Sequence, residues 1–368
     1  MNFNADEIIK NDEKAIFELR SLYRKYGYKQ YKMSKFEEYD FYAENKDFLV
    51  SDGIITFTDT NGKLMALKPD VTLSIIKNSQ AGSLTKVYYN ENVYRVSPGT
   101  HSFKEIMQTG LECIGDIDMY NICEVVLLAI KSLGAISDDT AFDISHMGII
   151  SLILKRFKTG DKYNDKLLKC IEQKNYHELC TLCDECGADF ELLKSVASVC
   201  DCGDNAIAKL ESLNLGEEFA AVTDELRQIN RVIKENGLAD NVKFDFSIVN
   251  DKNYYSGIVF KGYVNGIYQS VLSGGQYGSL MQKMGKSGDA IGFAVYLDAL
   301  ERLNCQRKKY DADIALIYDG NADISELTKF IRLLTDNGSN VLALKDIGNF
   351  RCRQVLKFNG GEIVEIND

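Results

Sequence analysis

The chain has 368 residues, of which 45% are hydrophobic and 26% are charged, and these values are ordinary for a globular protein larger than one average domain. Its 43 Lys and Arg residues stand against 54 Asp and Glu residues, for a formal charge of −11. Because a polyanion is bound through many Lys and Arg contacts to phosphate, this balance disfavours a nucleic-acid partner, although a local basic stripe remains compatible with it.

The N-terminus and the cysteines indicate the compartment. Residues 1–7 lack the basic and then apolar pattern of a signal peptide, and no apolar run approaches the roughly 18 residues that cross a bilayer. Ten cysteines are too sparse for a secreted disulfide scaffold. We therefore expect a cytoplasmic protein with free thiols and no membrane partner.

One cysteine cluster resembles a metal site in its spacing. Cys180, Cys183 and Cys186 are separated by two residues each, and Cys200-x-Cys202 follows. Thiolates at such spacing can bind zinc or an iron–sulfur cluster. The segment around them has a helical pattern and no second matching pair supplies the remaining ligand, so we favour a structural role and expect no metal.

The first elements expected along the chain are a helix and a series of strands. Residues 5–26 repeat apolar side chains with helical period, with Asn4 as a candidate N-cap and Gly27 as the stop. Short β-type segments separated by turns follow it, which indicates antiparallel pairing, with a hairpin around Asn61-Gly62. These segments are 53–59, 64–67, 86–90 and 92–95.

Residues 105–115 form the next expected strand. Gln108, Gly110 and Glu112 share one face of it because side chains alternate with a period of two. Polar groups on one face of an interior strand indicate a polar site, whereas a solvated face is the alternative.

The middle of the chain is mostly helical. Helices are expected over 121–133 and 147–157, on either side of a strand at 142–146, and 163–237 is almost continuously helical with breaks at glycines. Strands then resume, so the helical block of about 160–240 reads as an insertion in a β-rich domain. The later strands are 242–248, 258–263 and 267–272.

The C-terminal residues predict a separate small domain. A polar linker at 304–309 precedes a strand at 312–318, a helix at 324–334 and a strand at 340–344. The β-α-β order predicts a small parallel sheet. We therefore expect a domain over 1–303, carrying the insertion, and a small α/β domain over 310–368.

Several segments, in one order, resemble the class II core of histidyl-tRNA synthetases over about residues 5–303. Leu67-Lys68-Pro69-Asp70-Val71-Thr72 is similar to that family's Leu-Arg-Pro-Glu-Gly-Thr loop, and the segment 250–257, which ends in Tyr254-Tyr255-Ser256-Gly257, is similar to its Arg-Gly-Leu-Asp-Tyr-Tyr-Thr-Gly signature. Further matches are 93–95 with Gln108 and Glu112, 144–148, 273–277 and 291–294. The resemblance implies an α+β fold, in which helices flank an antiparallel sheet.

The departures from this family concern its cations. Arg95 matches the arginine that holds the ATP α-phosphate, and here we expect it to be vestigial. Asn250, Gln276 and Ala299 stand where the family has arginines, Ser97 replaces an acidic partner, and Ser34 replaces the proline of the dimer motif. Losing one preorganised donor lowers a rate by about 10²–10³. These departures therefore imply that the chain has no catalytic residues, and we expect no cofactor.

The same substitutions characterise the regulatory subunits of ATP phosphoribosyltransferase, which resemble a synthetase core without aminoacylation. That likeness implies a homodimer through the core, a short catalytic subunit as partner, inhibition by free L-histidine, and no tRNA. Residues 310–368 resemble a shortened anticodon-binding domain, but six basic residues against ten acidic ones suit RNA poorly. The alternatives are a divergent synthetase or adenylate-forming enzyme, and a synthetase-like interaction module.

By resemblance the histidine site is assigned residue by residue. Asp70, Thr72 and Gln108 would hold the α-ammonium group, although Asp70 is as good a candidate N-cap for a helix at 71–77. Glu112 and Tyr255 would address the imidazole nitrogens, Tyr277 would close the wall of the pocket, and Tyr254 is assigned to the same histidine site. The Gly-rich stretch 273–278 is expected to be a movable loop over the pocket, or else a tight turn at the edge of the sheet.

Overall fold

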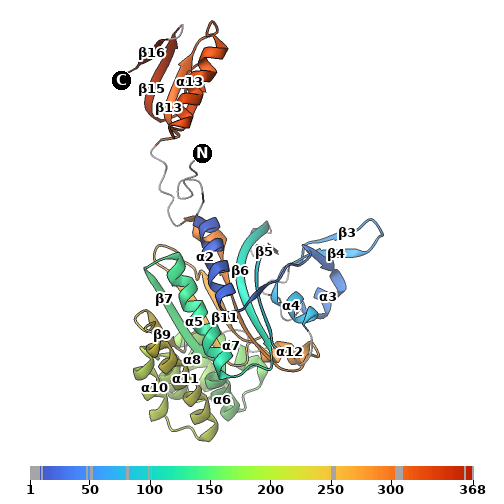
Figure 1. The fold of residues 1–368 in the computed structure, drawn as a ribbon. Helices are drawn as coiled ribbons and strands as arrows, with labels where there is room; N and C mark the ends of the chain where they lie inside the picture. The colour runs from blue at the N-terminus through green and yellow to red at the C-terminus, as the bar shows by residue number, and fades with distance from the viewer. Residues whose placement is uncertain are drawn as a thin grey trace. The chain divides into compact units, whose positions relative to one another are not determined.

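The protein is described from a computed structural model, which covers residues 9, 11–46, 49, 53–79, 83–97, 100, 102–249, 254–302, 310–359 and 362–366. Apart from Ile9, the described residues fall into two units, one within Lys10–Leu303 and the other within Asn304–Asp368 (Figure 1). Each unit has its own buried apolar cluster, so each is described by itself.

The larger unit is built on a nine-stranded sheet, in which the six strands from β5 to β7 pair antiparallel with one another, while β1 and β9 add to them in parallel. The order across the sheet is β1-β5-β6-β12-β11-β10-β7-β9-β8. The strands are β1 (Lys29–Gln30), β5 (Thr85–Val96), β6 (Phe103–Gly115), β12 (Asp289–Tyr296), β11 (Leu272–Gln276), β10 (Ile258–Val264), β7 (Thr140–His146), β9 (Val242–Asp245) and β8 (Cys200–Asp201). The predicted α+β class with a helix-flanked antiparallel sheet is confirmed.

Two helices, α2 (Asn11–Lys25) and α5 (Met119–Ile136), cover one face of this sheet (Figure 1). Alternation along the strands directs Tyr88, Leu111 and Phe293 into the core on this side. Asp118 caps α5 in a reciprocal capping box. Among the described helices, α5 alone is long and apolar enough to span a membrane by length and composition, and its packing on the sheet explains that composition.

The opposite face of the sheet carries shorter elements. These are α3 (Tyr39–Glu44), α4 (Thr72–Asn78), α12 (Gly278–Lys283) and a three-stranded sheet of β2 (Phe36–Glu38), β4 (Leu64–Leu67) and β3 (Thr56–Thr58). A second buried cluster joins Leu73, Ile76 and Leu280 of the helices to Tyr89 and Ile114 of the large sheet. These elements therefore pack over β5 and β6 and form a wall along one side of this face of the sheet.

The helical block between β7 and β9 consists of α6 (Met147–Phe157), α7 (Asp161–Glu172), α8 (Tyr176–Cys186), α9 (Phe190–Ala197), α10 (Gly203–Ser212) and α11 (Glu217–Glu235). Gly187 ends α8 in the left-handed conformation. Cys180, Cys183 and Cys186 all lie on α8, where Cys183 is buried in the core. Within the described ranges, no three His, Cys, Asp or Glu side chains converge as metal ligands.

The smaller unit is a four-stranded sheet with one helix. It contains β13 (Ala312–Tyr318), α13 (Ile324–Asp336), β14 (Val341–Leu344), β15 (Cys352–Asn359) and β16 (Glu362–Glu365), in the sheet order β14-β13-β15-β16. The predicted parallel β-α-β unit is confirmed by the parallel pairing of β13 with β14. The sequence analysis did not predict β15 and β16.

Several predicted boundaries differ from the structure. Residues 86–90 and 92–95 belong to a single strand, β5, and the strand expected over 242–248 ends at Asp245. The candidate N-cap Asn4 lies outside the described residues. The stretch 273–278 is neither a loop nor an edge turn, because its first four residues belong to β11, which pairs with β10 and β12 inside the sheet. Glycine composition suggested a loop, whereas the backbone is held by ladder hydrogen bonds on both sides.

Candidate functional site

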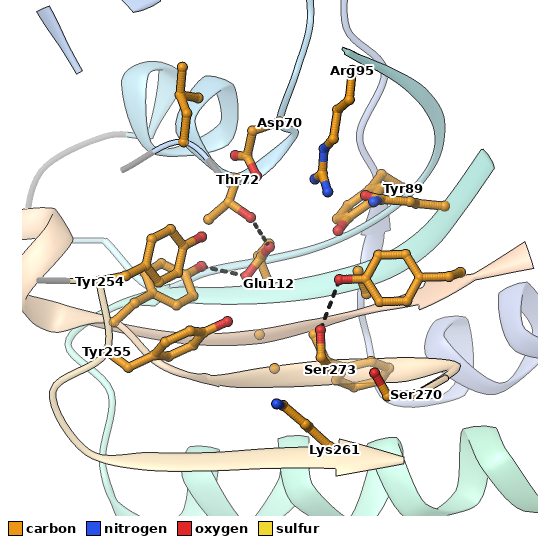
Figure 2. Close-up of a pocket in the computed structure, with 18 residues that line it drawn as sticks. Asp70, Thr72, Tyr89, Arg95, Glu112, Tyr254, Tyr255, Lys261, Ser270 and Ser273 are labelled. Atoms are coloured by element: carbon orange, nitrogen blue, oxygen red, sulfur yellow. Dashed lines mark hydrogen bonds between the residues drawn. The ribbon is translucent and has the colours of Figure 1, made fainter. Parts of the chain in front are cut away.

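A cavity of about 410 Å³ opens on the sheet face opposite α2 and α5 (Figure 2). Its floor comes from β5, β6, β12, β11 and β10, and its upper wall from Asp70 and Thr72 at the start of α4. Tyr254 and Tyr255, just before β10, and Tyr277, just before α12, close one end. The site is therefore assembled from five neighbouring strands and from several segments outside them, which also contribute Leu49 and Ser270.

The strand register explains why the floor is low enough to leave a cavity. Across the sheet Tyr89 pairs with Gly110, Gly110 with Ala294, Ala294 with Ser273 and Ser273 with Lys261. The three central residues of this row have small side chains, so the row forms a trough between Tyr89 and Lys261.

The neighbouring row of paired residues, which contains Glu112, also has residues without side chains in the middle of the sheet. Glu112 pairs with Gly292, and Gly292 pairs with Gly275. A Cβ atom on Gly292 would lie 1.7 Å from Oε2 of Glu112, and one on Gly275 would lie 2.8 Å from the ring of Tyr255. Both glycines therefore provide the space that these two cavity side chains occupy.

Glu112 is the most enclosed carboxyl group of the cavity, with 2% of its surface exposed. Oε1 accepts a 2.8 Å hydrogen bond from the Thr72 hydroxyl, and Oε2 accepts one from the Tyr277 hydroxyl. Burial raises the pKa of Glu112 to about 8, nearby Asp70 adds to the rise, and the two hydroxyl donors oppose it. At neutral pH the carboxyl group is therefore mostly protonated.

Asp70 both lines the cavity and caps a helix. Its Oδ1 accepts a 2.9 Å hydrogen bond from the backbone N–H of Leu73, near the start of α4. Burial raises the pKa of Asp70, while its backbone donors and the charge of Arg95 act in the opposite direction. Arg95 is itself fixed by a 3.1 Å hydrogen bond from Nε to the carbonyl oxygen of Pro69. The two interpretations of Asp70 made from the sequence are thus compatible.

Three tyrosines form the aromatic end of the cavity. The ring centroid of Tyr254 lies 4.6 Å from that of Tyr255 and 5.9 Å from that of Tyr277. Burial raises the pKa of all three phenols, so they are neutral at physiological pH. Their hydroxyl groups can donate to or accept from a polar ring, and their faces can pack against it.

The structure brings every predicted site residue to this one cavity. Those residues are Asp70, Thr72, Arg95, Gln108, Glu112, Tyr254, Tyr255 and Tyr277. The sequence analysis missed others, among them Tyr89, Lys261, Ser270, Ser273 and Tyr296. For Lys261, the available signal was its alternation with the buried Phe260 on β10, which directs it to the face opposite the core.

The positions that lack the expected arginines contribute no charge to the described part of the cavity. The Gln276 amide donates to the Asp289 carboxylate and does not line the cavity, and Ala299 is buried in the core on a short 3₁₀ helix. Asn250 lies outside the described residues. Among the described lining residues the cations are therefore Arg95 and Lys261.

Comparison with known proteins gives consistent results. A family model described as histidyl-tRNA synthetase matches residues 4–300. An ATP phosphoribosyltransferase regulatory subunit from Oceanobacillus iheyensis is 27% identical over 294 residues, which cover 78% of this chain and 72% of the relative.

Two solved structures share the fold. One, described as an ATP phosphoribosyltransferase regulatory subunit/histidyl-tRNA synthetase from Bacillus halodurans, is 24% identical with a TM-score of 0.73, and the alignment covers 97% of this chain and 96% of that one. The other, from the ATP phosphoribosyl transferase HisG:HisZ complex of Thermotoga maritima, is 20% identical with a TM-score of 0.61, and the alignment covers 78% of this chain and 97% of that one. At such identities the structural likeness supports the fold alone.

Proposed function

The chain belongs to the histidyl-tRNA synthetase family, and from that premise we propose that it is a non-catalytic regulatory subunit of an ATP phosphoribosyltransferase. It binds free L-histidine, assembles with a short catalytic subunit in the cytoplasm, and makes that subunit both active and inhibitable by histidine. Its own self-association is a homodimer through the larger unit, and neither tRNA nor a cofactor takes part.

The observation that carries this proposal is the composition of the cavity. Polar groups suited to an amino acid with a basic ring surround it, whereas Gln276 and Ala299 supply no positive charge there. Formation of an aminoacyl-adenylate needs fixed positive charge against the phosphates of ATP. The cavity is therefore suited to bind the amino acid without activating it.

Histidine fits the two kinds of groups present. Asp70, Thr72 and Gln108 offer acceptors for the α-ammonium group, and Glu112 and Tyr255 offer partners for the two imidazole nitrogens. Both oxygens of Glu112 already accept hydrogen bonds from Thr72 and Tyr277, so what an imidazole nitrogen adds is an acceptor for the carboxyl proton. An amino acid without such a nitrogen would leave this buried O–H unpaired, which costs about 1–3 kcal/mol.

The proposed partner follows from the relatives. The relative from Oceanobacillus iheyensis is named as a regulatory subunit, and the Thermotoga maritima structure comes from a complex of two proteins. A subunit without chemistry affects an enzyme only if its bound and free forms favour different states of that enzyme, and such coupling is typically worth about 1–3 kcal/mol.

The absence of catalysis is tested by histidine-dependent exchange of pyrophosphate into ATP. We expect the purified chain to give no exchange above background at saturating histidine. Exchange that depends on both histidine and the cavity residues would show that the chain is a divergent synthetase.

The regulatory role is tested in the reconstituted complex with the short catalytic subunit. We expect Glu112→Ala to relieve inhibition by histidine while the complex still assembles, because Glu112 faces the cavity and is buried. Glu185→Ala, at an exposed position of α8, serves as the matched control. If the Glu112→Ala complex remains fully inhibitable, the inhibitory histidine binds elsewhere.

A further inference from the structure

Lys261 is a cation of the cavity that the function described so far does not use. It lies on β10, a strand with neighbours on both sides, and Figure 2 shows it reaching into the cavity from the side opposite Asp70 and Arg95. Its side chain is only partly exposed. Among the residues that the structure describes, none forms a hydrogen bond or an ion pair with it.

The carboxylate best placed to neutralise Lys261 within the sheet is Asp143, its partner on β7 in the strand register. These two described side chains form no ion pair. The charged neighbours that act on Asp143 are Asp245, Lys243 and Lys174. The ammonium group of Lys261 therefore lacks a protein counter-ion among the described residues, although it is drawn partly out of water.

The surroundings of Lys261 within the cavity are hydroxyl groups. Ser273 is its partner on β11, and the Ser273 hydroxyl shares a 2.9 Å hydrogen bond with the Tyr296 hydroxyl, while Ser270 lines the same end (Figure 2). Hydroxyl groups can donate to an anion beside a cation. This end therefore has the composition of a small anion site.

The other cation of the cavity is placed differently. Arg95 is held by its hydrogen bond to Pro69, and its charge acts on Asp70. The cavity thus has an acidic and aromatic end around Asp70 and Glu112 and a cationic end around Lys261. A ligand with a basic group at one end and an anionic group at the other would match both.

We propose that Lys261 and the hydroxyl of Ser273 bind the anionic group of the ligand, so that Lys261 determines specificity for a zwitterionic or phosphorylated ligand over one that carries only the amine and the ring. For free histidine the anionic group is the α-carboxylate. This inference rests on the proposed histidine site, and it names the residues that bind the ligand's negatively charged group.

The test compares three ligands that differ at this group alone, by isothermal titration calorimetry on the full chain. L-histidine carries a carboxylate, L-histidinol an alcohol, and L-histidinol phosphate a phosphate at the same carbon. A hydrogen bond between charged groups corresponds to a factor of about 10–100 in affinity. We expect the unaltered chain to prefer at least one of the two anionic ligands over L-histidinol by about this factor, and the preferred anion identifies the group for which the site is built.

The variant is Lys261→Gln, which keeps most of the length of the side chain and removes its charge. We expect it to lose the preference for the anionic ligands while its affinity for L-histidinol stays within about threefold. Lys261→Arg should retain the preference. Lys243→Gln is the matched control, because Lys243 is an exposed lysine on β9, two strands away from β10, where it pairs with Asp143 of β7 and lies outside the cavity.

The outcomes separate this inference from the function on which it rests. A preference that survives in Lys261→Gln, or an equal loss of affinity for all three ligands, would overturn the role of Lys261 and leave the histidine site standing. Failure of all three ligands to bind the unaltered chain would overturn both proposals. A thermal unfolding curve of each variant shows whether an equal loss arises from misfolding, and Lys261→Arg then decides the question in a folded protein.

Discussion

Replacing Glu112 by glutamine should change how stability depends on pH. The pKa of this carboxyl group is ordinarily 4.5 and rises to about 8 in the folded chain. An unfolded chain therefore ionises Glu112 at lower pH than the folded chain does. The protonated Glu112 therefore contributes to the free energy of unfolding in full below about pH 4.5. This contribution falls as the pH rises toward about 8 and does not change further above that value.

The magnitude follows from the same two values. One pKa unit corresponds to about 1.4 kcal/mol. Between about pH 5 and pH 9 the ionisation of Glu112 should lower the free energy of unfolding by about 4 kcal/mol. A glutamine side chain cannot ionise, so the free energy of unfolding of Glu112→Gln should rise relative to that of the unaltered chain by about this amount over the same range.

The assay is urea unfolding at a series of pH values, followed by circular dichroism and tyrosine fluorescence, since the chain has 20 Tyr and no Trp. Titration of the groups that do not interact with Glu112 cancels in the difference between variants. Glu185→Gln, on the exposed surface of α8, is the matched control substitution. A flat difference for Glu112→Gln would refute the reasoning, because it would mean that burial does not hold the proton on Glu112.

The remaining predictions concern three substitutions, at Gly292, Gly134 and Asp118, and are read from urea midpoints and, for Gly292, from calorimetric titrations. Gly292→Ala should destabilise the larger unit by about 1–3 kcal/mol and abolish ligand binding, because its Cβ would lie 1.7 Å from Glu112 Oε2 and 2.6 Å from the carbonyl oxygen of Leu111. Gly134→Ala on α5 should instead raise the free energy of unfolding by up to about 1 kcal/mol, because its Cβ would meet nothing within 4 Å. Asp118→Ala should lower the free energy of unfolding by about 1 kcal/mol, because it removes the capping box of α5. An unchanged urea midpoint would show that the cap is dispensable.

The site residues that the sequence revealed are those whose signal lies within one segment. The period of two along β6 was enough to place Gln108 and Glu112 on one face, and the structure finds both in the cavity. The rest of the floor depends on which strands are neighbours. Lys261 and Ser273 face the same trough as Tyr89 only because of the order β5-β6-β12-β11-β10, which no local pattern contains.

The wrong prediction for β11 has a related cause. Glycine is rare in strand interiors, so Gly274 and Gly275 suggested a loop. In the folded chain a Cβ atom on Gly274 would lie 2.3 Å from the carbonyl oxygen of Gly292, and one on Gly275 would lie 2.5 Å from that of Ile258. These glycines are required by close approach of neighbouring strands, and that requirement is visible only once the strands have been paired.

The register that forms the trough also constrains how the chain folds. Glu112 and Gly292 are paired although 180 residues separate them in the sequence, so this contact closes a very long loop and belongs to the class of contacts that slow folding. The cavity does not exist in any intermediate in which β12 has not yet docked between β6 and β11. Its ligand consequently binds only chains that have completed the sheet, and withdraws them from the unfolding equilibrium by mass action. Under the proposed function, the concentration of L-histidine would in this way set the stability of the folded subunit as well as the inhibition of its partner.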